Sequence, residues 1–180
     1  MSTLVEHRGH SITIGPEEDG ESPLSWGDPV KLFHWHKRGF CGQRTDNDPR
    51  AQDLQSSGAY LAPLYLYEHS GQTVSLAPFR DPWDSGQVGF LYVEPEAGRK
   101  EFGRHWRVGA KKAVESMVEI LDQYLRGDVW YYSVDGHLCQ DSCGDIYGYD
   151  EAVKQAKEAI DADIEREERE SKACQRVLAL

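Results

Sequence analysis

The chain has 180 residues, of which 39% are hydrophobic, and it carries 31 acidic against 20 basic residues for a formal net charge of −11. This charge disfavours nucleic-acid binding, because phosphate neutralisation requires a basic face. Solubility is the ordinary reason for an acidic composition, and a protein partner with a basic surface is the specific alternative. No apolar run approaches the roughly 18 residues that span a bilayer, and residues 1–7 lack the basic region followed by an apolar one that is typical of a signal peptide. We therefore expect one cytoplasmic domain over residues 1–180, with four free cysteines and no cofactor.

The first 30 residues contain little predicted structure. An alternating run, 11–14, is typical of a short strand, but Gly15-Pro16 and the acidic turn at 17–20 interrupt it. The sequence predicts a strand stub followed by a loop, or a partly mobile arm. We expect residues 1–30 to form a variable N-terminal arm.

The middle of the chain is dominated by predicted strands. Ser70-Gly71 is typical of a tight hairpin connection, and the turn formers before Pro49 could cap a short helix over 49–56. Four apolar runs bounded by turn residues predict strands at 30–41, 60–69, 73–77 and 87–93.

Two helices are predicted in the second half. Apolar residues recur at three- and four-residue spacing over 108–126 and again over 150–165, where Asp150 is the expected N-cap. Between the helices, the sequence predicts a strand at 129–134 that ends in a hairpin turn at Asp135-Gly136. After the second helix, residues 165–180 are predicted to form a charged helical extension. The predicted fold is α+β, with one antiparallel sheet of about four to six strands packed by these two main helices.

The central residues carry a resemblance to a known family. It covers about residues 31–148 and is most specific in two stretches, PLYLYEHSG at 63–71 and PWDSGQVGFLYV at 82–93. With Trp35-His36 before them and Asp141-Ser142-Cys143 after them, these stretches resemble a widespread family of small phage- and plasmid-encoded proteins. The resemblance implies a cytoplasmic protein of a mobile element, and it implies no activity, ligand or catalytic residue.

The same central residues supply side chains for nucleophilic catalysis. His69 could activate Ser70 or Ser85, with Asp84 or Asp141 orienting the imidazole. A cysteine version would pair Cys143 with a histidine. Turn chemistry explains the serines and aspartates equally well, so His69, Asp84 and Cys143 remain candidates for a small hydrolase.

Metal binding has two candidate patterns. His34 and His36 lie two residues apart on a predicted strand and therefore share a face, a spacing that allows one metal ion between them. Exposed or hydrogen-bonded histidines without a metal are the favoured interpretation. Four carboxylates at strand ends could instead converge on a magnesium ion in a nuclease-like site: Asp81, Asp84, Asp128 and Asp141.

A binding surface is the interpretation that we favour. Several side chains of the central residues are explained neither by turn chemistry nor by burial in a strand. Trp130 beside Asp128 is a candidate aromatic anchor near an acid. The predicted binding residues are Arg80, Trp83, Asp84, Gln87, Asp128 and Trp130. The expected function is an acidic mobile-element protein that inhibits a host defence complex of the CRISPR or restriction type, and the alternative is the small enzyme.

Overall fold

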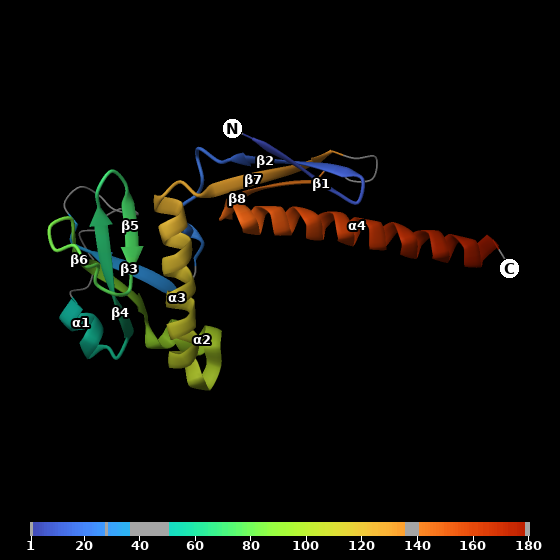
Figure 1. The fold of residues 1–180 in the computed structure, drawn as a ribbon. Coiled ribbons are helices and arrows are strands. Elements are labelled where there is room, and N and C mark those ends of the chain that lie inside the picture. Colours follow the sequence, from blue (N-terminus) through green and yellow to red (C-terminus); the bar gives the residue numbers. More distant parts are fainter. Residues whose placement is uncertain (1, 28, 37–50, 136–140, 179–180) are drawn as a thin grey trace. The chain divides into compact units, whose positions relative to one another are not determined.

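The computed structural model describes residues 2–27, 29–36, 51–135 and 141–178, with the backbone alone at 51, 135, 141 and 174–178. The chain forms two compact units: unit 1 is Met1–Gly20 with Gly127–Leu180, and unit 2 is Glu21–Arg126 (Figure 1). The α+β class and the antiparallel pairing are confirmed. The strands, however, are divided between two four-stranded sheets, and each unit has its own hydrophobic cluster, where the sequence predicted one sheet in one domain.

Unit 2 contains the sheet β3-β6-β4-β5. Its strands are β3 (Val30–His34), β4 (Tyr60–Glu68), β5 (Gln72–Ser75) and β6 (Ser85–Val93), and its helices are α1 (Ala51–Ser56), α2 (Pro95–Phe102) and α3 (Trp106–Leu125). Ser70 has a φ of 61°, and the β4–β5 connection confirms the predicted hairpin. The predicted strand 30–41 ends at His34, and its part from 37 on lies outside the described residues.

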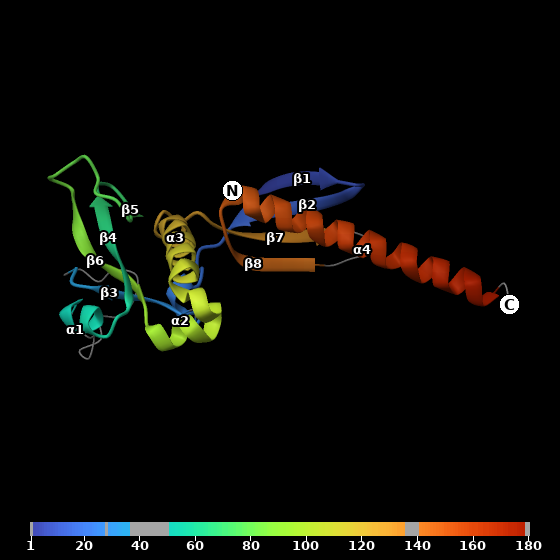
Figure 2. The ribbon, with the colours of Figure 1, turned by 90° about the horizontal axis from the view of Figure 1, so that it is seen from below.

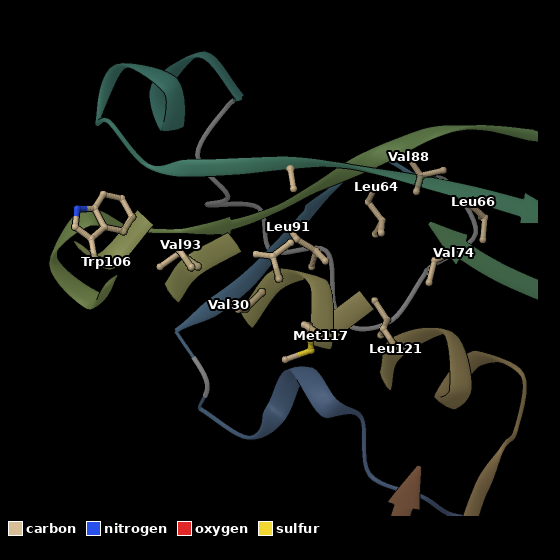
Figure 3. Close-up of a cluster of buried hydrophobic side chains, with 13 residues drawn as sticks. Val30, Leu64, Leu66, Val74, Val88, Leu91, Val93, Trp106, Met117 and Leu121 are labelled. Carbon is tan, nitrogen blue, oxygen red and sulfur yellow. The ribbon is translucent and has the colours of Figure 1, made fainter. Parts of the chain in front are cut away.

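The core of unit 2 lies between this sheet and α3. The predicted helical stripe is confirmed, because Ala110, Val114, Met117 and Leu121 are buried at spacings of three and four residues. Figure 3 shows Met117 and Leu121 near the sheet side chains that they cover, including Leu91. Gly127, with a φ of 70°, follows the helix and terminates it.

Unit 1 contains the sheet β1-β2-β7-β8, packed by one long helix. Its elements are β1 (Thr3–His7), β2 (His10–Pro16), β7 (Val129–Asp135), β8 (Asp141–Tyr147) and α4 (Tyr149–Leu178). The predicted arm over residues 1–30 therefore differs from the structure, since 3–16 form two paired strands and Ile12 and Ile14 are fully buried. The arm was expected because a hairpin whose partner strand is over 100 residues away leaves no local signal.

Helix α4 covers one face of the unit 1 sheet and then continues past it, as both ribbon views show (Figures 1 and 2). Small side chains, Ala152 and Ala156, and then Ile160 are fully buried against the sheet. Beyond Ile164 most side chains up to 173 are exposed, which confirms a charged helical extension over that range. The helix begins at Tyr149, so Asp150 lies in its first turn and is not the N-cap.

Helix α2 was not predicted from the sequence. Gly98 lies within it, and glycine weakens a helical pattern. The structure gives the reason for this glycine, because a Cβ at position 98 would lie 2.4 Å from the Trp106 ring. In the part of the chain that the structure describes, no helix combines the length and the apolarity that crossing a membrane requires.

Candidate functional site

The turn before β6 is built by Asp81. Its Oδ1 accepts hydrogen bonds from the backbone N–H groups of Trp83, at 2.8 Å, and Asp84, at 3.3 Å. The Ser85 hydroxyl donates to the Asp81 carbonyl oxygen. Aspartate is favoured here because its short carboxylate satisfies backbone donors two and three residues ahead. Asp81 therefore shapes the turn that presents Trp83 and Asp84, and its carboxylate is already engaged.

The structure brings the predicted pair His69 and Asp84 together. The His69 Nδ1 atom lies 3.0 Å from Asp84 Oδ2, and the backbone N–H of Glu68 donates to the Asp84 carbonyl at 2.8 Å. Both side chains are accessible, with 65% of His69 and 41% of Asp84 exposed. The end of β4 and the turn before β6 thus hold an imidazole–carboxylate pair at the surface.

The two serines next to this pair in the sequence take part in turns. The Ser85 hydroxyl is directed to the Asp81 carbonyl, and Ser70 forms the hairpin turn. Cys143 lies in β8 of unit 1, where its exposed thiol is 3.6 Å from the Gly144 carbonyl oxygen. His137, Cys41 and Cys139 fall outside the described residues, as does the side chain of Asp141.

A cavity of about 280 Å³ opens beside the pair. Leu66 and Val88 contribute its apolar lining, and Glu68 and Asp84 contribute its carboxylates. The His36 Nε2 atom lies 3.6 Å from Glu68 Oε2. The remaining lining residues are Trp83, Ser85 and Gly86. The sequence interpretation missed Glu68, although its position next to His69 at a strand end was a usable signal.

Trp83 is unusual in this cavity because 92% of it is exposed. A large apolar ring without a cover is uncommon on a surface and is typical of a binding anchor. Gln87 differs, since its Nε2 donates to the Gly89 carbonyl at 3.3 Å and so supports β6. Arg80 is exposed in the loop before the Asp81 turn.

The predicted histidine metal site has no third ligand in the described structure. His34 is buried on β3 opposite Gly89, while His36 lies beside Glu68. Within residues 2–27, 29–36, 51–135 and 141–178, no group of three His, Cys, Asp or Glu residues could hold a metal ion. The carboxylates proposed for magnesium are also divided, since Asp128 and Asp141 belong to unit 1 and Asp81 and Asp84 to unit 2.

Asp128 and Trp130 make structural contacts at the start of β7 in unit 1. The Trp130 indole N–H donates to Asp128 Oδ1 at 2.5 Å, and its ring meets Tyr149 edge-on with centroids 5.1 Å apart. The Asp128 carbonyl accepts from Gly148 N–H just before α4. Trp130 is half-buried by these contacts, so the predicted exposed anchor is not observed at this position.

The net charge is concentrated in one unit. Unit 1 has 17 acidic and seven basic residues, a formal charge of −10, whereas unit 2 has 14 acidic and 13 basic residues, a formal charge of −1. The two segments of unit 1 lie at opposite ends of the sequence, so this division becomes visible only when their pairing is known. The acidic surface predicted from composition is therefore a property of unit 1.

No family model, curated protein or solved structure matches this chain.

Proposed function

We propose that this protein acts by binding a partner protein through the acidic surface of unit 1. The observation that carries the proposal is the formal charge of −10 on unit 1 beside −1 on unit 2. A field of one sign attracts an oppositely charged surface and accelerates its association. The partner is expected to present a basic surface, and direct binding of nucleic acid is disfavoured because the phosphates would be repelled.

Helix α4 is the element best suited to this role. It has nine acidic and six basic residues, and Glu165, Glu168 and Glu170 are exposed on its extension. Pairs within the helix, such as Lys172–Glu168 at 3.2 Å, neutralise only part of this charge. The extension has few core contacts, so its side chains are available to a partner.

The partner class follows from the resemblance of residues 31–148 to phage and plasmid proteins. Host defence complexes of the CRISPR and restriction type bind nucleic acid through basic channels, which an acidic protein surface can occupy. We therefore place the protein in the host cytoplasm as an inhibitor of such a complex. The absence of a complete catalytic set among the described residues fits this role.

Affinity capture from host lysate tests the proposal when it is combined with charge variants. The α4 variant removes three exposed acids, and a matched control removes three exposed acids from unit 2. The α4 substitutions are Glu165→Gln, Glu168→Gln and Glu170→Gln, and the control substitutions are Glu96→Gln, Glu101→Gln and Glu119→Gln.

A basic partner should be captured by the wild-type and control proteins at 50 mM salt and be lost at about 500 mM, where the Debye length falls to a few ångströms. The α4 variant should capture at least about fivefold less, because each removed rim charge slows association. Circular dichroism checks that its helix is intact. Equal capture by both variants, or capture that high salt does not reduce, contradicts the proposal.

A small enzyme is the second candidate, and the 3.0 Å contact between His69 and Asp84 beside a cavity favours it. His69→Ala and Asp84→Asn should then lower a hydrolytic rate by about 100-fold or more, because they remove a general base and its orienting group. Activated esters and single-stranded DNA with Mg²⁺ are suitable substrates for a screen. A rate that is unchanged in both variants excludes this pair as the catalyst.

A further inference from the structure

We propose that the cavity beside β6 is a binding site for a guanidinium group, and that it takes an arginine side chain of a partner protein. The site lies wholly in unit 2, so it does not depend on the acidic surface of unit 1. Its parts are the residues Glu68, Trp83 and Asp84, which line one cavity of about 280 Å³. That volume suits one side chain rather than an extended ligand.

The two carboxylates give the site its preference for a cation. Both are held in place by neighbours, since Gln72 Nε2 donates to Glu68 Oε1 at 3.3 Å and His69 lies 3.0 Å from Asp84 Oδ2. Within the described residues, neither carboxylate forms an ion pair with a lysine or an arginine. Their only partners among the basic side chains of these residues are imidazoles, His36 beside Glu68 at 3.6 Å and His69 beside Asp84.

The indole explains why a guanidinium fits better than an inorganic cation. Trp83 is 92% exposed, and a planar guanidinium stacks on an aromatic face while its N–H groups reach carboxylates at the side. Leu66 and Val88 offer an apolar surface to the methylene groups of the same arginine. An anionic ligand would meet two carboxylates, and an apolar ligand would leave them without a partner.

The probe that we propose is Nα-acetyl-arginine amide, titrated into the full-length ¹⁵N-labelled protein. The Trp83 indole N–H signal, assigned by its loss in Trp83→Phe, should shift saturably at millimolar concentrations, as expected for one small cation. Nα-acetyl-citrulline amide has nearly the same shape without the charge and should give no saturable shift. Free L-arginine distinguishes the source, since tighter binding of the free amino acid indicates a small-molecule ligand and overturns the assignment to a protein side chain.

Three variants locate the site. Trp83→Ala and Glu68→Gln should each weaken binding about tenfold, and Glu68→Gln retains an oxygen to accept the Gln72 hydrogen bond. Glu96→Gln removes an exposed charge of the same unit away from the cavity lining and should bind as the wild type does. For Glu68→Gln binding is followed at Trp83, and for Trp83→Ala by isothermal titration calorimetry.

The proposal is overturned if citrulline produces the same shift as arginine, or if Glu96→Gln weakens binding as much as Glu68→Gln. An unchanged melting temperature in each variant shows that loss of binding does not arise from unfolding. Because none of these residues belongs to unit 1, loss of arginine binding here and loss of partner capture by the α4 variant are independent results.

Discussion

The two units differ in the size of their buried hydrophobic clusters and in their formal charge. Among the described residues, unit 2 has a cluster of 13 buried residues and unit 1 a cluster of eight. The formal charge of unit 2 is −1 and that of unit 1 is −10. Burial of apolar surface stabilises a fold, and like charges held close together destabilise it. Unit 1 is therefore expected to be the less stable unit.

Truncation of one fully buried side chain in each unit tests this division most strongly. Leu91→Ala in unit 2 and Ile160→Ala in unit 1 each remove several methyl or methylene groups from a cluster, and each should cost about 2–5 kcal/mol of unfolding free energy. Hydrogen exchange locates the effect. Ile160→Ala should accelerate amide exchange in β2 and β7, and Leu91→Ala should accelerate it in β4 and β6.

Conservative variants control for the size of the change. Ile160→Val should produce the same pattern with a loss of about 1 kcal/mol. If Ile160→Ala accelerates exchange equally in β4 and β6, the units unfold as one cooperative structure, and the comparison of their separate stabilities fails.

Local patterns predicted helix α3 and the β4–β5 hairpin of unit 2, although not helix α2. The α3 stripe needs only spacings of three and four residues, and the β4–β5 hairpin needs only Ser70-Gly71 between two apolar runs. The contact between His69 and Asp84 could also be predicted, because both residues lie at predicted strand ends within one short stretch of the sequence.

Unit 1 was harder to predict because its pairing is distant in sequence. The register joins Ile12 to Val134 and Ile14 to Tyr132, and no local pattern indicates such pairs. The same separation concealed the charge of unit 1 and made residues 1–30 resemble an arm. The half-buried position of Trp130 was not predictable for a related reason, since its ring partner Tyr149 belongs to another element.

The second test replaces one glycine by alanine in each sheet. A Cβ at Gly89 of β6 would lie 2.2 Å from the Phe33 carbonyl oxygen, whereas a Cβ at Gly15 of β2 would lie 2.6 Å from the Tyr131 ring. Backbone cannot move aside as a half-buried side chain can. Gly89→Ala should therefore cost about 3 kcal/mol and Gly15→Ala about 1 kcal/mol, as measured by urea unfolding.

Gly71→Ala is the matched control, since its Cβ would meet nothing within 4 Å. Its effect should be below about 0.5 kcal/mol. If Gly15→Ala proves the more costly of the two sheet variants, then Tyr131 is fixed as firmly as backbone, and the unit 1 sheet is more rigid than its small cluster suggests.

The smallest expected effects come from one surface ion pair in each unit. In unit 2, Lys31 Nζ lies 2.6 Å from Glu94 Oε2, and this hydrogen bond raises the pKa of Lys31 above its ordinary value. In unit 1, Asp161 Oδ1 lies 2.9 Å from His7 Nε2 and 3.1 Å from Arg8 Nε. Apart from His7, the side chains of these residues are about 40–55% exposed. Because exposed ion pairs contribute little, Lys31→Met and Asp161→Asn should each lower the free energy of unfolding by about 0.5 kcal/mol.

The pH dependence of the lost unfolding free energy distinguishes the Lys31–Glu94 pair from the ion pairs of Asp161. A lysine with a raised pKa in the folded state contributes its stability below the ordinary lysine pKa of about 10.4 and loses it as the pH rises through the raised value. Lys31→Met should thus differ from wild type at pH 8 and converge with it toward pH 11.5 in urea unfolding. A difference that persists at high pH would mean that the charge of Lys31 is not the cause of the loss, because methionine keeps an unbranched apolar side chain at this position of the edge strand β3.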